Sequence, residues 1–279
     1  MAQSIFIWHI RMMKKVRVLH LGDEMGWRGG ENQIQLLIEH TASKVDHFIA
    51  YPGKSRGYQK FQGYKQILGY FGRKLNPVSL YQLVSFCKRH KVHIIDAHSS
   101  VGHSMGILAK YFLPHIKLVV HRRVAFPISD RARTKKKYFH KFVDQYVAVS
   151  HKIAESLTDY GVAADKVQVV HSGVKIFETK ASEKKQQKDK LLEQIGVRKD
   201  VCLIGNASAF TSEKDYPTLL KALKLLHDKK VVFHGVFAGD GKDLEDCKNL
   251  AKRLGLEGHV TFLGYQNNCL LYTSDAADE

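Results

Sequence analysis

Short apolar runs alternate with amphipathic stretches along most of the chain, and this alternation predicts its secondary structure. The apolar runs are rich in β-branched residues and stop at Gly, Asp, His or Pro, which is typical of buried strands. The stretches between them repeat apolar residues every three or four positions, which is typical of helices with one buried face. The predicted strands are 16–21, 47–51, 92–97, 117–121, 142–150, 166–171, 201–205, 231–238 and 260–264. The predicted helices are 77–90, 104–112, 152–160, 217–227 and 242–254, together with one around 34–38.

Strands that alternate with helices in this way predict an α/β fold, in which a parallel sheet carries helices on both faces. A chain of 279 residues favours two Rossmann-like domains, which we place at 14–177 and 197–268. Segment 178–196 begins with a run that lacks apolar residues and is predicted to be the linker, with a helix at the C-terminal end of that polar run as an alternative. The second domain has only three predicted strands, where such a sheet usually has about five or six, so we expect it to be incomplete.

Three further segments stand apart from this pattern. Residues 54–77 are rich in Lys, Arg, Gly and Tyr and are predicted to form a mobile basic loop around a short strand. Residues 1–13 are interpreted as an upstream extension, with a short membrane-surface anchor as the alternative. Residues 269–279 have no periodicity and are interpreted as a foreign tail on a truncated gene.

A glycine turn connects the first predicted strand to the first helix. Gly29 and Gly30 would let an anion approach the main chain, and the helix that follows would direct its N-terminal amides at that anion. The alternative is a glycine-rich loop that only turns the chain, because a glycine pair is a weak signal.

Composition narrows the classes of partner without choosing among them. The chain has 44 Lys and Arg against 27 Asp and Glu, a formal net charge of +17, which indicates an anionic partner or else a well-solvated surface. The anionic partners to consider are nucleic acid, an anionic membrane face and a phosphorylated substrate. The four cysteines are far apart and fit reduced thiols in a cytoplasmic protein. No apolar run approaches the length of a membrane span.

Histidines at predicted strand ends are the first candidates for chemistry. His98, His103 and His121 are placed where parallel strands deliver residues to the ligand edge of a sheet, although any one of 16 histidines can equally be structural. Arg122 and Arg123 adjoin His121 and suit an anionic substrate, with neighbouring strand residues pointing to opposite faces.

The second domain offers a cation and a glycine-flanked turn. Lys214 precedes a predicted helix and could bind a diphosphate, or could be an exposed lysine in a turn. The Gly239-Asp240-Gly241 segment could bind a nucleotide or could be a common turn. No Asp-x-Asp pair ends a strand in the body of the chain, which favours a mechanism without a metal or cofactor.

The order of eight short motifs carries a resemblance to a known family. The chain, over residues 14 to about 268, resembles the family 4 glycosyltransferases of GT-B fold. The motifs are GGEN (29–32), DAHSSVGHSMG (96–106), LVVH (118–121), YVAVS (146–150), VVHSGV (169–174), EKDYPTLLKAL (213–223), FAGDG (237–241) and VTFLGY (260–265).

The resemblance implies a retaining transferase with a nucleotide-sugar donor in the cleft between two Rossmann-like domains and a cell-envelope glycan or lipid-linked acceptor. It implies that Gly29 and Gly30 approach the donor phosphates or the acceptor, that His121 contacts the transferred sugar and that Lys214 binds the diphosphate. Glu31, within the GGEN motif, is grouped with His98, His103, Arg122 and Arg123 as a substrate or acceptor candidate.

The chain departs from the family pattern at two places. Ala209 stands where the family often has an arginine, five residues before the lysine. The family's paired-glutamate segment would follow residue 268, so we expect this chain to be inactive as it stands.

Two other classes of function make predictions that the sequence does not meet. An NAD-dependent oxidoreductase predicts G-x-G-x-x-G after the first strand, whereas the chain has GWRGGEN. A nucleic-acid-binding module predicts a basic helix face or an aromatic platform, and neither is evident, so nucleic acid is not an expected partner. The expected location is the cytoplasm, with the basic surface at the inner membrane face.

Overall fold

A computed structural model describes residues 15–69, 76–124, 127–174 and 181–266. The chain forms two compact units, residues 1–176 and residues 177–279, which are described separately below. The predicted N-terminal extension and the predicted foreign tail lie outside the described residues.

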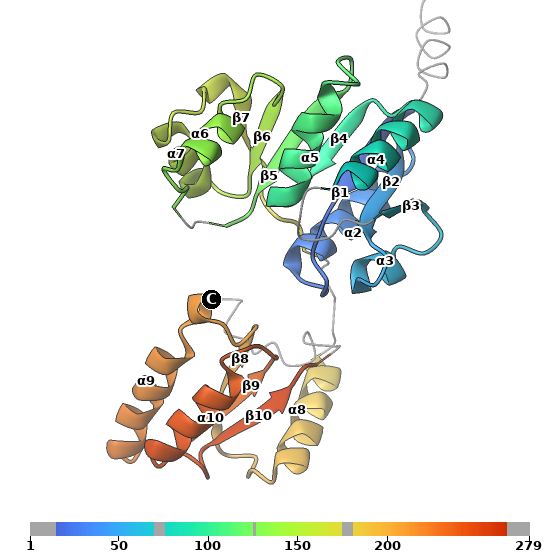
Figure 1. The fold of residues 1–279 in the computed structure, drawn as a ribbon. Helices are drawn as coiled ribbons and strands as arrows, with labels where there is room; N and C mark the ends of the chain where they lie inside the picture. Colours follow the sequence, from blue (N-terminus) through green and yellow to red (C-terminus); the bar gives the residue numbers. More distant parts are fainter. Residues whose placement is uncertain (1–14, 70–75, 125–126, 175–180, 267–279) are drawn as a thin grey trace, which may run out of the picture. The chain divides into compact units, whose positions relative to one another are not determined.

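The first unit is built on a seven-stranded sheet in the order β3-β2-β1-β4-β5-β6-β7, and every pairing is parallel (Figure 1). The parallel α/β fold predicted from the alternating pattern is therefore confirmed. The strands are β1 (Val16–Leu21), β2 (Val45–Pro52), β3 (Lys65–Gly69), β4 (Ile94–Ala97), β5 (Lys117–Arg122), β6 (Gln145–Ala148) and β7 (Val167–Val169).

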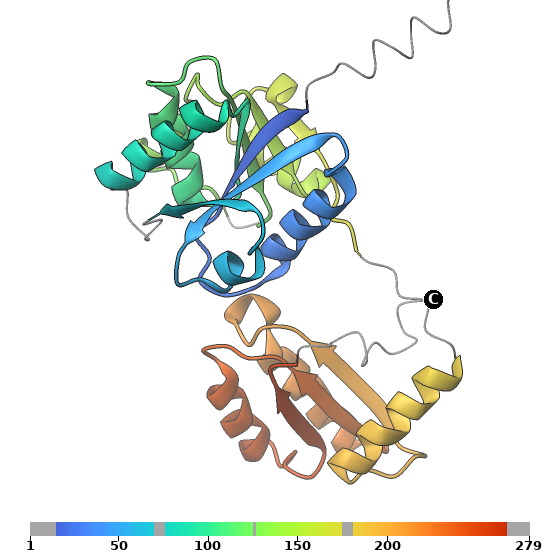
Figure 2. The same ribbon diagram turned by 90° about the vertical axis from the view of Figure 1, so that its right-hand side faces the viewer.

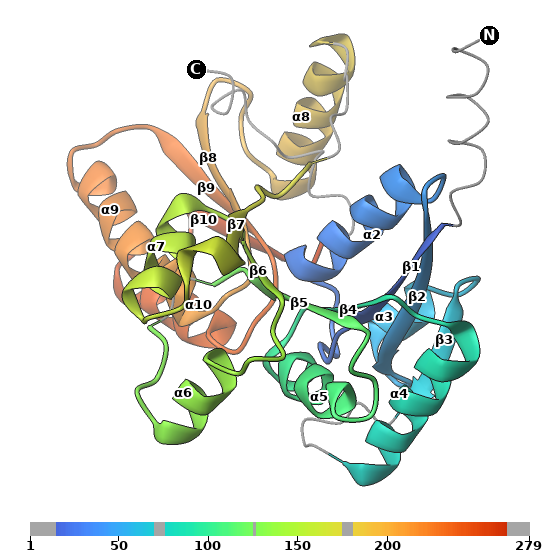
Figure 3. The same cartoon turned by 90° about the horizontal axis from the view of Figure 1, so that it is seen from above.

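Helices cover both faces of this sheet. One face packs on α2 (Gly29–Thr41), and the other packs on α4 (Pro77–His90) and α5 (Ser100–Lys110), as Figure 3 shows. The remaining helices of the unit are α3 (Arg56–Lys60), α6 (Ala132–Tyr138), α7 (His151–Asp159) and the 3₁₀ turn η1 (Ala164–Lys166).

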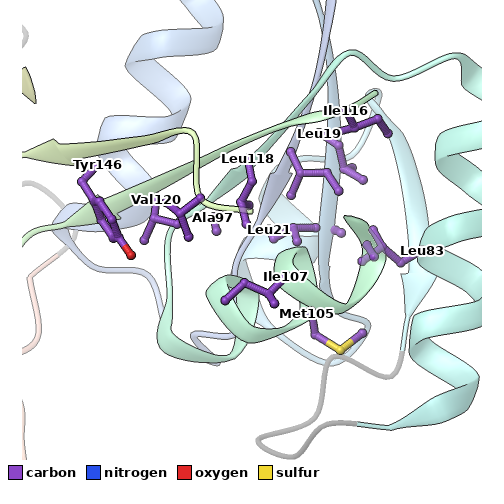
Figure 4. Close-up of a cluster of buried hydrophobic side chains, with 14 of the residues drawn as sticks. Leu19, Leu21, Leu83, Ala97, Met105, Ile107, Ile116, Leu118, Val120 and Tyr146 are labelled. Atoms are coloured by element: carbon purple, nitrogen blue, oxygen red, sulfur yellow. The ribbon is translucent and has the colours of Figure 1, made fainter. Parts of the chain in front are cut away.

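Alternation along the strands decides which residues meet which helices. Leu19 and Leu21 of β1 are fully buried in the larger core, together with Leu118 and Val120 of β5 (Figure 4). Successive residues of a strand point to opposite faces, so His20 lies on the α2 face between the two leucines. The α2 face therefore receives the polar residues of otherwise apolar strands.

The second unit has a three-stranded parallel sheet in the order β10-β9-β8 (Figure 2). Tyr216, Leu220 and Leu223 of α9 share a buried core with Cys247 and Ala251 of α10. The elements are α8 (Ala181–Ile195), β8 (Cys202–Ala207), η2 (Ser212–Lys214), α9 (Tyr216–Asp228), β9 (Phe233–Ala238), α10 (Leu244–Arg253) and β10 (Val260–Gly264).

The differences from the predicted elements have local causes. The helix predicted from residue 104 begins at Ser100, because the Ser99 hydroxyl accepts a hydrogen bond from Gly102 N at 3.0 Å and caps it. The predicted loop 54–77 contains the expected strand β3 but also the short helix α3. Residues 181–195, within the predicted linker, form a helix that buries Leu191 and Leu192.

Candidate functional site

The carboxyl ends of the central strands of the first unit form one edge, at which α2 begins. This edge is where ligands bind in open parallel sheets. At β1 the chain turns at Gly22, where an added Cβ would lie 2.0 Å from Cζ of the buried Tyr51 ring. Only glycine fits at position 22, because the ring of Tyr51, near the end of β2, approaches the main chain so closely.

The N-terminus of α2 offers free backbone amides. Arg28 is the extended N-cap residue, and among the described residues no acceptor bonds to the amides of Gly29 or Gly30. Glu31 has both carboxylate oxygens occupied, one by the Tyr51 hydroxyl at 3.0 Å and the other by Arg28 N at 3.1 Å. Burial raises the pKa of Glu31 above its usual value. These two hydrogen bonds of Glu31 hold the first turn of α2, which contains Gly29 and Gly30.

Arg123 places a guanidinium group beside this helix N-terminus. Its Nη1 lies 3.8 Å from the position that a Cβ on Gly30 would take, and its Nη2 lies 3.3 Å from Nδ1 of His121. Burial lowers the pKa of Arg123, although nearby Asp96, Tyr51 and Glu31 oppose that effect. Unbonded amides, a helix dipole and a guanidinium are the groups that bind anions in proteins, so the start of α2 is a candidate anion site.

Arg122 points to the other face of the sheet, as the alternation of strand residues predicts. Its Nη1 donates to the Tyr138 hydroxyl at 2.9 Å. The two neighbouring arginines therefore do not form one cationic cluster.

A buried cluster of imidazoles and one carboxylate lies on the α2 face of the sheet. His121 Nε2 is 2.8 Å from Asp96 Oδ1, and His98 Nε2 is 3.0 Å from Asp96 Oδ2. His20 Nδ1 reaches the same Oδ2 at 3.0 Å, and its Nε2 lies 2.9 Å from His47 Nδ1. Strands β2, β1, β4 and β5, which are neighbours in the sheet, contribute to this cluster.

Burial and the neighbouring side chains shift three pKa values in this cluster. Burial lowers the pKa of His98 to about 3 and that of His47 to about 4, so both imidazoles are neutral near pH 7. Burial alone would raise the pKa of Asp96, but its contacts with His98 and His121 and the hydrogen bond from His20 outweigh burial and hold it well below the usual range. Asp96 therefore carries its negative charge at neutral pH.

The sequence-based candidates did not include His20, Asp96 or His47. A signal for two of them was present, because His20 and Asp96 interrupt apolar strands and a buried polar group needs a partner. Which partner each one finds depends on the strand order.

His103 lies apart from this edge, within α5. Its ring packs edge-on against Tyr138 and Tyr146, and its Nε2 is buried without a hydrogen-bond partner among the described residues. Burial lowers the pKa of His103 to about 3.

This burial predicts a pH dependence of stability. Below pH 6.5 His103 becomes protonated in the unfolded chain but stays neutral in the folded unit. The contribution of His103 to the free energy of unfolding is therefore largest above pH 6.5 and decreases as the pH falls toward 3. His103→Leu should reduce the loss between pH 6.5 and 5 by up to about 1.4 kcal/mol per pH unit, as measured by urea unfolding. His115→Leu, at an exposed position, is the control and should leave the slope unchanged. Equal slopes in all three proteins would contradict the prediction.

In the second unit, Lys214 and the Gly239–Gly241 segment lie on adjacent loops at the carboxyl edge of the sheet. Lys214 is exposed at the end of η2, just before α9. Phe210 N donates to Asp240 O at 3.0 Å, and Asp243 N donates to Phe210 O at 3.1 Å. The glycine-flanked turn therefore holds the loop that leads to Lys214.

The glycines of this turn are required by close packing. A Cβ on Gly241 would lie 2.2 Å from Phe210 O, and one on Gly239 would lie 1.9 Å from Ser208 O. A hollow of about 660 Å³ in the same unit is lined by Val201, Phe233 and His259, where the strands begin, and so lies away from these loops.

The sequence of the chain matches the models of known protein families. Residues 27–176 match the model of Glycosyltransferase Family 4, and residues 166–276 match that of Glycosyl transferases group 1. The first match alone spans more than half of the chain, so the chain belongs to glycosyltransferase family 4.

Individual relatives are more distant. The chain is 26% identical over 190 residues to an uncharacterized glycosyltransferase of Methanocaldococcus jannaschii, which is 63% of this chain and 47% of the relative. It is 26% identical over 198 residues to alpha-monoglucosyldiacylglycerol synthase of Streptococcus pneumoniae, which is 65% of this chain and 44% of the relative. The chain thus matches about half the length of these relatives.

Among solved structures, Anabaena HepE in complex with UDP and glucose superimposes with a TM-score of 0.74. The two sequences are 18% identical, and the match covers 92% of this chain and 71% of HepE. This likeness shows the fold, and the predicted GT-B class is confirmed. Among the described residues, no helix has both the length and the apolar character that a bilayer crossing requires.

Proposed function

We propose that the chain carries the acceptor-side domain and part of the donor-side domain of a retaining glycosyltransferase. Its donor is a nucleoside-diphosphate sugar, and its acceptor is a cell-envelope glycan or a lipid-linked glycan. The bond between the sugar C1 and the diphosphate breaks, an acceptor oxygen bonds to C1, and the acceptor proton and the nucleoside diphosphate leave. Family membership and the UDP-glucose ligands of a structural neighbour support the donor class.

The observation that carries the proposal is the anion site at the N-terminus of α2. Gly29 and Gly30 begin α2 at the ligand edge of the sheet, and Arg123 Nη1 lies 3.8 Å from the position that a Cβ on Gly30 would take. A phosphate oxygen, or an anionic group on the acceptor, satisfies these donors at once. His121 adjoins Arg123 and is our candidate for contact with the transferred sugar.

The second unit supplies Lys214 for the departing diphosphate. An ammonium group at that position offsets the negative charge that develops as the C1–oxygen bond breaks. We propose that the diphosphate is held in this way, by fixed protein cations and amides, with no metal ion or cofactor at the reacting bond.

Two observations support the proposed acceptor: the lipid product of one matched relative and the positive net charge of this chain. A matched relative is a monoglucosyldiacylglycerol synthase, whose product is a membrane glycolipid, and this chain has a net charge of +17. Helix α6 adds Lys135, Lys136 and Lys137 in a single turn. A basic surface of this kind favours a place against anionic lipid at the cytoplasmic membrane face.

Lys214→Ala tests the donor site. We expect about a 100-fold loss in affinity for a UDP-sugar, because the cation that neutralises the diphosphate is removed. The measurement is isothermal titration calorimetry with a panel of UDP-, GDP- and ADP-sugars.

Lys221→Ala is the matched control, since Lys221 is also exposed but lies within α9. It should bind the donor as the unmodified chain does. Equal affinities of the two variants for the UDP-sugar, or no binding of any nucleotide sugar, would contradict the proposed donor site.

A further inference from the structure

Three ligand atoms converge inside the first unit. Nδ1 of His20, Nε2 of His98 and Oδ2 of Asp96 form a nearly equilateral triangle, with sides of 3.0, 3.0 and 3.1 Å. The three side chains are 0%, 2% and 7% exposed, respectively. They come from β1, from β4 and from the residue that follows β4 (Figure 1).

Hydrogen bonds to Asp96 Oδ2 account for two sides of this triangle. An imidazole nitrogen has one in-plane direction, occupied by either a proton or a lone pair. When His20 Nδ1 and His98 Nε2 both donate to the carboxylate, they cannot bond to each other, although they lie 3.1 Å apart. Without those two protons, the three atoms offer lone pairs at a spacing that suits the ligands of one metal ion.

We propose that His20, Asp96 and His98 form a buried binding site for a divalent transition-metal ion of the zinc class. Zn²⁺ takes nitrogen and oxygen ligands at about 2.0–2.2 Å in a tetrahedron, which places ligand atoms about 3.3 Å apart. The sides of the triangle are only a few tenths of an ångström shorter. Two imidazoles and one carboxylate suit Zn²⁺ rather than Mg²⁺ or Ca²⁺, which prefer oxygen ligands throughout.

Two of the three side chains, His20 and Asp96, have outer contacts of the kind that supports metal ligands, whereas Nδ1 of His98 is buried without a hydrogen-bond partner among the described residues. The second nitrogen of His20 lies 2.9 Å from His47 Nδ1, and His47 Nε2 lies 2.9 Å from the Thr41 hydroxyl. The second oxygen of Asp96 lies 2.8 Å from His121 Nε2. Such outer contacts fix the tautomer of a ligating histidine and the orientation of a ligating carboxylate.

The ion would tie β1 to β4 near the ligand edge of the sheet. Metal binding here is inferred from these side chains alone and does not rest on the proposed transfer reaction. The occupancy of the site can be measured without any assay of activity.

The test is metal binding by the full chain, expressed without a histidine tag, stripped with chelator and dialysed. Added Zn²⁺ should bind one ion per chain by elemental analysis and raise the unfolding temperature. Co²⁺ should give the visible absorption of a tetrahedral nitrogen and oxygen site. Both effects should disappear on addition of chelator.

Variants assign the ion to the triangle. His98→Gln and Asp96→Asn keep the size of each side chain, and either should abolish stoichiometric binding. His47→Ala, behind His20, should weaken affinity by about 10–100-fold. His115→Ala, at an exposed position, is the control and should bind the ion as the unmodified chain does.

Two results would overturn the proposal. One is the absence of stoichiometric Zn²⁺ and Co²⁺ binding by a chain that circular dichroism shows to be folded. The other is equal binding by the unmodified chain and by folded His98→Gln and Asp96→Asn, which would place the ion elsewhere.

Discussion

Asp96→Ala should destabilise the first unit by about 3–5 kcal/mol, the range for removing one partner of a buried charge network. Asp96 is 5% exposed and contacts the rings of His20, His98 and His121. Its removal leaves three buried imidazoles without their common acceptor, and each unpaired polar group adds a desolvation cost.

Urea unfolding followed by tryptophan fluorescence measures this loss. Trp27 lies in the first unit, with its ring 5.4 Å from that of the buried Phe61, and it reports on the packing of that unit. Chelator should be present throughout, so that the loss reflects the carboxylate and not a bound ion. Asp46→Ala is the control: Asp46 is 43% exposed, with ion-pair distances of 3.7 and 4.0 Å, and should cost less than about 1 kcal/mol. Equal losses for the two variants would show that the buried network contributes little.

Gly239→Ala should cost about 3 kcal/mol in the second unit and weaken donor binding along with it. Gly239 has φ +146°, which side-chain-bearing residues rarely adopt, and its added Cβ would lie 1.9 Å from the backbone oxygen of Ser208. Because the obstacle is backbone, the β8–α9 loop itself has to move. That loop leads to Lys214, so the ammonium group moves with it.

Hydrogen exchange of the amides from Ser208 to Lys214 measures the loop, and urea unfolding followed by circular dichroism measures stability. Gly258→Ala is the matched control, since a Cβ on Gly258 meets nothing within 4 Å. The control should change stability by less than about 0.5 kcal/mol. Unchanged exchange in Gly239→Ala would show that the loop does not depend on this contact.

Elements that carry their own pattern were predicted closely. The first strand was predicted at 16–21 and the last at 260–264, and β1 and β10 have those bounds. Helix α4 was predicted at 77–90 and begins with Asn76 as its N-cap and Pro77 at its first position. Hydrophobic periodicity and capping act within a few residues, so the sequence alone is enough to place such elements.

Helices without an apolar stripe were either missed, like α6, or predicted only as an alternative, like α8. Helix α6 has the sequence ARTKKKY and no buried residue, so no periodicity marks it. Helix α8 buries Leu191 and Leu192 in an otherwise polar segment. Such helices depend on contacts with the rest of the unit more than on their own pattern.

The candidate site likewise has features that the sequence predicts and features that only the tertiary structure shows. The sequence by itself determined the alternation of strand and helix, the glycine pair near the start of the first helix and the position of Arg123 just after a strand. Only the tertiary structure brought Arg123 to Gly30 and joined His20, His47, Asp96 and His121. The reason is physical: periodicity is a local property of the chain, whereas strand order and register bring together residues far apart in it, such as His20 and Asp96, which are 76 positions apart.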